Sequence, residues 1–105
     1  MNAQQIELKK ELLEMLRKQG AFWSYDPNKL DLLSDEIIME KGLIHTELED
    51  MDLLFSVYPK KELKRIWRER LVSHPDRYGI LNLILAAKVF RVKNVLSYLK
   101  RYGKH

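Results

Sequence analysis

No stretch of this 105-residue chain alternates apolar and polar residues with the period of two that a half-buried β-strand requires. Apolar residues recur instead every three or four positions, which is the spacing of an amphipathic helix. In the segment Lys60–Ser73 they fall on one helical face, which consists of Leu63, Ile66, Trp67 and Leu71. Only four glycines and three prolines are present, too few for a fold with many tight turns. The sequence therefore predicts an all-α protein.

Signals for helix ends divide the chain into five or six short helices. Gly20 suits the end of the first helix, Ser34 can cap the second, and Gly42 is expected to end it. Thr46 and Glu49 form a capping-box pattern, in which each side chain satisfies a backbone donor of the other. The predicted helices are Ala3–Lys18, Asp35–Lys41, a helix between Thr46 and Pro59, Lys60–Ser73, about Tyr78–Phe90, and a last helix from about Val92 to Tyr102.

The chain is expected to form one compact helical domain over residues 1–105, because its length suits a single domain and 46% of its residues are hydrophobic. Phe22 and Trp23 are too apolar for a solvent loop and are expected in the core with Trp67. The segment Tyr78–Phe90 is apolar almost all round, which predicts a central helix with neighbours on several sides.

Residues that could support catalysis are sparse. The chain has no cysteine, and its three histidines are scattered at positions 45, 74 and 105. It also has no phosphate-cradling glycine loop, no HExxH motif and no nucleophile elbow. A cluster of acids at the start of one predicted helix matches what the helix dipole favours and does not require a metal; it comprises Glu47, Glu49, Asp50 and Asp52. We therefore expect no catalytic residue, no cofactor, no metal site and no enzymatic activity.

The sequence also bears on location. Its first residues are polar, without the pattern of an export signal. The longest apolar run, Ile80–Ala87, falls far short of the roughly 20 residues that a membrane-spanning helix needs. We therefore expect a cytoplasmic protein that does not enter a membrane.

Charge is divided unevenly between the two halves of the chain. Residues 1–58 carry six basic and twelve acidic side chains, whereas residues 59–105 carry thirteen basic and three acidic ones, for a net charge of +10. This asymmetry favours an anionic partner for the second half. It is equally compatible with two halves that partly neutralise each other when folded, and with ordinary solvated helix faces.

The candidate binding residues are the cations of two predicted helices. Arg70 falls within the apolar sector of its helix, so it is expected to pair with an acid or to extend past the core. The full candidate set for nucleic acid or a partner protein is Lys61, Lys64, Arg65, Arg68, Arg70, Lys93, Lys100 and Arg101.

The tripeptide His74-Pro75-Asp76 suggests an alternative function. It follows a basic segment, KKELKRIWRERLVSHPDRY, and resembles the loop through which a J-domain co-chaperone engages an Hsp70. A J-domain continues from a flexible loop into a long third helix, whereas here an apolar segment begins only a few residues later, after Gly79. The same tripeptide can simply end one helix and begin the next. A co-chaperone remains the alternative interpretation.

A broader resemblance extends from Phe22 to Tyr102. The chain resembles a small bacterial family of uncharacterised all-helical proteins, often encoded beside nucleotidyltransferase toxins of the abortive-infection type. The stretches that carry this resemblance are FWSYDPNKLD (residues 22–31), DEIIMEKGL (35–43), EDMDLLFSVYPKKELKRIW (49–67), RYGILNLILAAKVF (77–90) and KNVLSYLKRY (93–102). Ser24 departs from the family pattern, in which this position is often acidic.

The resemblance implies an antitoxin-like component. Together with the charge pattern, it leads to the expectation of a non-enzymatic binding protein that recognises a partner protein and DNA through its basic second half. A nucleotidyltransferase toxin is the candidate partner protein. A homo-oligomer is also compatible with the sequence, because the apolar residues of Ala3–Lys18 cover more than one narrow stripe.

Overall fold

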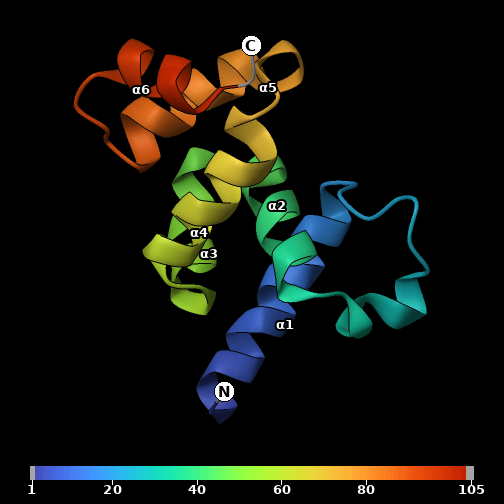
Figure 1. Cartoon of the computed structure of the whole chain (residues 1–105). Coiled ribbons are helices and arrows are strands. Elements are labelled where there is room, and N and C mark those ends of the chain that lie inside the picture. Colours follow the sequence, from blue (N-terminus) through green and yellow to red (C-terminus); the bar gives the residue numbers. More distant parts are fainter. Residues whose placement is uncertain (1, 104–105) are drawn as a thin grey trace. The chain divides into compact units, whose positions relative to one another are not determined.

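The computed structural model describes residues 2–103, and these residues contain helices and no β-strand (Figure 1). The all-α fold predicted from the sequence is confirmed. The α-helices are α1 (Ala3–Lys18), α2 (Asp35–His45), α3 (Met51–Val57), α4 (Lys60–Trp67), α5 (Pro75–Ile84) and α6 (Val95–Tyr102). Two 3-10 turns, η1 (Pro27–Leu32) and η2 (Leu48–Asp50), and two π turns, η3 (Arg68–Val72) and η4 (Leu85–Val89), complete the order.

Contacts group the chain into two compact units, Met1–Lys60 and Lys61–His105. The organisation as one domain over residues 1–105 stays a prediction. Within residues 2–103, no helix has both the length and the apolar character needed to cross a membrane.

Local signals set several helix ends in the first unit. Ser34 caps α2 as predicted, because its hydroxyl accepts a hydrogen bond of 3.3 Å from the Ile37 amide. Gly20 follows α1 with a φ of 77°, the left-handed conformation that glycine adopts without strain. The expected end of α2 at Gly42 is wrong, since the helix continues to His45. A Cβ atom at position 42 would lie only 2.7 Å from a methyl carbon of Leu54, so this glycine allows α3 to approach α2 closely.

Two further expectations for the first unit are wrong. Thr46 does not form a capping box: it follows α2, and its buried hydroxyl has no hydrogen-bond partner in the described structure. Trp23 does not enter the core, because its side chain is 88% exposed. The preceding residue, Phe22, is buried instead and packs edge-to-face with Tyr25, with ring centroids 6.1 Å apart. One aromatic ring of the predicted pair fills the core, and the next points away from it.

A polar contact ties three parts of the first unit together. The Tyr58 hydroxyl donates a hydrogen bond of 2.7 Å to Asp35 Oδ1, and Lys9 Nζ lies 3.2 Å from the same oxygen. The hydrogen bond from Tyr58, helped by Lys9, holds the pKa of Asp35 below its usual value. Burial and the neighbouring Asp35 carboxylate raise the pKa of Tyr58 far above its ordinary value.

Replacing Tyr58 with phenylalanine is expected to lower the free energy of unfolding by about 1–3 kcal/mol at pH 7, since it removes a hydrogen bond to a charged group. The depressed pKa of Asp35 means that the stabilisation is lost as the pH falls below about 4. The raised pKa of Tyr58 means that it is lost as the pH rises above about 10. The difference in free energy of unfolding between wild type and Tyr58→Phe should therefore be largest between about pH 4 and about pH 10 and become smaller below and above this range.

Urea denaturation over this pH range measures that difference. Tyr25→Phe is the matched control, because the Tyr25 hydroxyl makes no hydrogen bond within the described residues. A loss of stability in Tyr58→Phe that does not change with pH would contradict the role assigned to Asp35.

The second unit is built around Trp67, which is fully buried. The indole Nε1 donates a hydrogen bond of 3.0 Å to Asn82 Oδ1, and Asn82 Nδ2 donates one of 2.9 Å to the carbonyl oxygen of Leu71. Leu71 belongs to the π turn that continues α4, so the asparagine joins α5 to this turn. The predicted helical face of Leu63, Ile66, Trp67 and Leu71 is buried and thus confirmed.

The expectation of a central helix buried on several sides is wrong for α5. Its Ile80 is 78% exposed, and Leu83 and Ile84 are also exposed. Within α5, only Asn82 is buried, and the buried apolar residues come later, in η4: Leu85, Ala86 and Val89. The apolar composition of α5 therefore did not predict its burial.

Candidate functional site

A stack of aromatic rings leads from the core of the second unit to its surface. Phe90 stacks on Trp67 with centroids 4.8 Å apart, and Tyr98 stacks on Trp67 at 5.5 Å with the two planes 7° apart. Tyr102 follows Tyr98 at 4.7 Å with a tilt of 49°. Trp67 is fully buried, whereas Tyr102 is 38% exposed. Tyr102 is therefore the end of the stack that solvent reaches.

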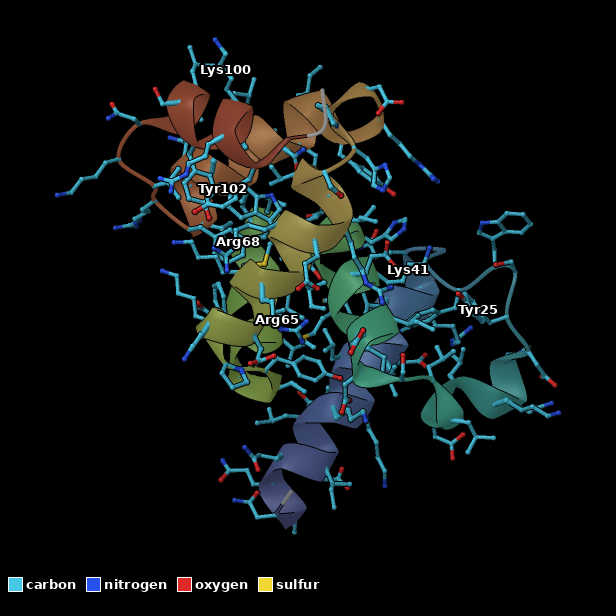
Figure 2. The ribbon with its side chains drawn as sticks, viewed as in Figure 1. Tyr25, Lys41, Arg65, Arg68, Lys100 and Tyr102 are labelled. Carbon is cyan, nitrogen blue, oxygen red and sulfur yellow. The ribbon has the colours of Figure 1, made fainter. Side chains whose placement is uncertain are left out.

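Three cations lie over the two tyrosine rings. Lys64 Nζ is 5.5 Å from the centroid of Tyr98, and the guanidinium carbons of Arg68 and Arg101 are 5.3 and 5.5 Å from that of Tyr102. These distances fall within the range of cation–π attraction. Figure 2 shows Arg68 beside Tyr102. We call these residues the cation–tyrosine cluster: Lys64, Arg68, Tyr98, Arg101 and Tyr102.

The Tyr98 hydroxyl is an unusual member of this cluster. Its oxygen is buried and has no hydrogen bond of good geometry to any described residue. Burial raises the pKa of Tyr98, although the Arg68 guanidinium opposes that shift. Tyr98 therefore remains a neutral phenol at physiological pH.

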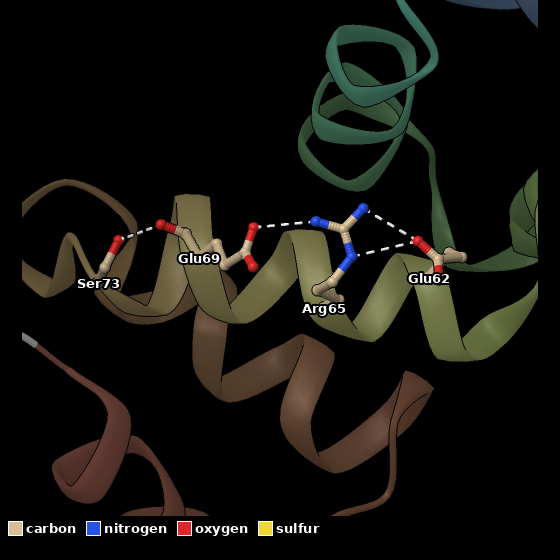
Figure 3. A network of polar contacts seen from close by, with 4 residues as sticks. All are labelled: Glu62, Arg65, Glu69 and Ser73. Atoms are coloured by element: carbon tan, nitrogen blue, oxygen red, sulfur yellow. Dashed lines mark hydrogen bonds and ion pairs between the residues drawn. The ribbon is translucent and has the colours of Figure 1, made fainter.

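The acidic residues next to the cluster are occupied by one arginine. Arg65 binds Glu62 through Nε and Nη2, at 3.1 and 2.9 Å, and binds Glu69 through Nη1 at 3.1 Å (Figure 3). Residues 59–105 contain only one further acid, Asp76. Among residues 2–103, no carboxylate forms an ion pair with five of the predicted binding cations: Lys64, Arg68, Lys93, Lys100 and Arg101. The positive charge of the cluster is therefore not neutralised locally.

An open pocket of about 300 Å³ adjoins the cluster on α6 and the loop before it. Its lining combines cations, two aromatic rings and two small polar side chains: Lys93, Asn94, Ser97, Tyr98, Arg101 and Tyr102. Asn94 precedes α6 but makes no capping hydrogen bond with its side chain. The amide group of Asn94 is therefore not committed to the helix.

The structure brings together four of the eight cations that the sequence analysis named. Lys64, Arg68 and Arg101 belong to the cluster, and Lys93 joins them through the pocket. Arg65 is held by its two glutamates, and Arg70 is half-buried. Lys61 and Lys100 are exposed and contact neither tyrosine ring. Lys104 and His105 lie outside the described residues.

Sequence reasoning did not identify the tyrosines, Asn94 or Ser97 as site residues. An aromatic residue at helical spacing usually indicates a core position, so the pattern around Tyr102 does not point to an exposed site. The signal that could have revealed the site is the i, i+4 spacing of Tyr98 and Tyr102, with Arg101 between them on a short basic helix.

The tripeptide of the alternative co-chaperone interpretation lies at a helix junction. Pro75 and Asp76 form the first turn of α5, and His74 is the residue before that helix. All three are exposed, and only Ser73 separates them from η3. The tripeptide therefore occurs at the start of a helix and not within an extended loop.

Carboxylate oxygens of the acidic cluster, Glu47, Glu49 and Asp50, lie within 4.8 Å of one another, and all three residues are exposed. Contact with Glu47 raises the pKa of Glu49, as expected for neighbouring like charges. The positive end of the helix dipole favours acidic residues in this position, so their clustering does not require a bound cation.

Comparison of the chain with protein-family models, with curated proteins and with solved structures found no match.

Proposed function

We propose that this chain is a non-enzymatic binding protein whose second unit holds a nucleic acid through the cation–tyrosine cluster. The observation that carries the proposal is the gathering of Lys64, Arg68 and Arg101 around two tyrosines, without a carboxylate partner among residues 2–103. These cations come from two segments far apart in the sequence, α4 with η3 and α6. Fixed cations of this kind can neutralise phosphates and release their counterions.

The tyrosines favour nucleic acid over an acidic protein surface as the ligand. A nucleic acid presents phosphates next to flat rings, so it can use cations and aromatic rings in the same site. An acidic protein surface can also pack against tyrosine rings, but its carboxylates do not alternate with flat rings as the phosphates and bases of a nucleic acid do. The cluster joins both features within a few ångströms, at Arg68, Arg101 and Tyr102.

The resemblance to the bacterial family adds a partner protein to this proposal. In an antitoxin-like role the chain would also bind the product of a neighbouring gene, with a nucleotidyltransferase toxin as the candidate. Co-expression of that gene should then give growth rescue and a complex that purifies intact. If the chain does not relieve the toxicity, the antitoxin-like role is excluded. Nucleic-acid binding is tested separately, as described next.

Reversing two charges of the cluster should weaken nucleic-acid binding strongly. We expect Lys64→Glu combined with Arg68→Glu to lower affinity by about 10- to 100-fold at low salt, because two phosphate contacts are lost. The slope of log affinity against log salt should also become shallower by about two, since each contact contributes about one. Fluorescence anisotropy with a labelled oligonucleotide at several salt concentrations measures both quantities.

Arg77→Glu combined with Lys88→Glu is the matched control. It changes the net charge by the same amount, and both residues are exposed in the same unit but outside the cluster. We expect a much smaller loss of affinity from this pair. Equal losses in the two double variants would mean that binding depends only on overall charge, and a flat salt response in the wild type would remove the nucleic-acid function.

A further inference from the structure

We infer that the pocket beside Tyr102 takes one unstacked base, so that the ligand of this site is a single-stranded nucleic acid and not a duplex. This inference rests on the proposed function and names its substrate class. Three features of the pocket support this inference: an exposed ring, small polar groups beside that ring, and cations in the lining of the pocket.

The exposed ring belongs to Tyr102. In the stack, Tyr98 is covered by Trp67, which lies almost parallel to it, and Lys64 lies over the same ring. Tyr102 touches Tyr98, and the guanidinium groups of Arg68 and Arg101 lie over its ring, but 38% of the residue stays exposed. A base that stacks there would extend the row of rings that begins in the core. Inside a duplex both faces of each base are covered by its neighbours, so an unpaired strand offers a face to Tyr102 far more readily than a duplex does.

The polar groups of the pocket suit the edge of a base. Asn94 and Ser97 both line it, and the Asn94 side chain makes no capping hydrogen bond to α6. An amide group can donate to and accept from a base edge at the same time. Lys93 and Arg101 line the same hollow and can meet the phosphates on either side of that base. The volume of about 300 Å³ is at the small end of the range for ligand pockets, so it suits one nucleotide.

The first test compares a 5′-fluorescein-labelled 20-nucleotide strand with the 20-base-pair duplex that contains it. The wild-type protein is expected to bind the single strand at least ~10-fold more tightly. Tyr102→Ala should lower single-strand affinity by about 5- to 50-fold, which is the usual effect of losing one stacked base. Duplex affinity should not change, and neither should the salt slope, because no phosphate contact is removed.

Two variants separate stacking from other effects of the substitution. Tyr102→Phe keeps the ring and should bind like the wild type. Trp23→Ala removes a ring of the first unit that is 88% exposed and has no cation over it among residues 2–103, so it should leave binding unchanged. Far-UV circular dichroism and thermal melting establish whether each variant is folded.

A second measurement uses only the wild-type protein and does not depend on the folding of any variant. A single strand that carries 5-iodouracil is irradiated in the complex, and the crosslinked residue is identified by mass spectrometry. Crosslinking at Tyr102 is expected. Crosslinks confined to residues outside the pocket would overturn the inference.

The outcomes distinguish the inference from the proposed function. Equal, salt-dependent binding of both nucleic acids, unaffected by Tyr102→Ala, would overturn the inference and leave the proposed function standing. Binding of neither nucleic acid would overturn both.

Discussion

Replacing Trp67 with alanine is expected to lower the free energy of unfolding of the second unit by about 3–5 kcal/mol. Trp67 is fully buried, stacks on two other rings and donates a hydrogen bond to Asn82. The substitution leaves a large cavity, and it removes the partner of a buried amide oxygen. Small domains are stable by only about 5–15 kcal/mol, so this loss removes a large fraction of the stability.

Urea denaturation followed by far-UV circular dichroism measures this loss. Trp23→Ala is the matched control, because it removes the same side chain from a position that is 88% exposed. The control is expected to change the free energy of unfolding by less than about 0.5 kcal/mol. A Trp67→Ala protein within about 1 kcal/mol of the wild type would show that the ring stack is not the core of this unit.

The second large effect is expected at Asn82, which satisfies two buried groups at once. Its oxygen accepts from the indole of Trp67, and its nitrogen donates to the Leu71 carbonyl. Asn82→Asp keeps the shape but removes the donor, so a carboxylate oxygen faces a carbonyl oxygen inside the unit. We expect this change to cost about 3–5 kcal/mol at pH 7, as for an uncompensated buried charge. Asn82→Leu should cost about 2–3 kcal/mol, because it leaves two buried groups without partners but introduces no charge.

The pH dependence distinguishes these two variants. Burial raises the pKa of the introduced carboxyl above its unfolded value of about 3.9. Its protonated form can donate to the Leu71 carbonyl, so the stability of Asn82→Asp relative to Asn82→Leu should be greatest below about pH 4 and should fall as the pH rises. Groups that titrate in both variants contribute equally to each, so they cancel when the free energy of unfolding of Asn82→Leu is subtracted from that of Asn82→Asp. A difference that stays constant between pH 3 and pH 7 would contradict the buried hydrogen bonds described for Asn82.

The parts of the fold that the sequence predicted correctly are those that depend on neighbouring residues. Ser34 begins a helix because its side chain reaches an amide three residues away, and Gly20 ends one through its own backbone conformation. The errors arose where a distant segment decides the outcome. Gly42 lies inside a helix and leaves room for Leu54 to approach, and Trp23 is exposed whereas its neighbour Phe22 is buried.

The candidate site divides in the same way. Lys64, Arg68 and Arg101 could be named from the basic faces of their helices. Arg65 was named with them, although glutamates three residues before it and four after it favour the pairing that the structure shows. The role of the tyrosines could not be read from periodicity. The stacking of Tyr98 on Trp67 depends on how α6 packs against the end of α4, which local spacing does not determine.

The continuous row of rings from Phe90 to Tyr102 has a thermodynamic consequence. The residues that hold the second unit in its native conformation are also those that orient Tyr102 toward solvent. A molecule that binds this folded site more tightly than it binds the unfolded chain should, by mass action, raise the melting temperature. Ligand binding at Tyr102 and folding of the second unit are therefore coupled, so a rise in melting temperature also reports that the site is occupied.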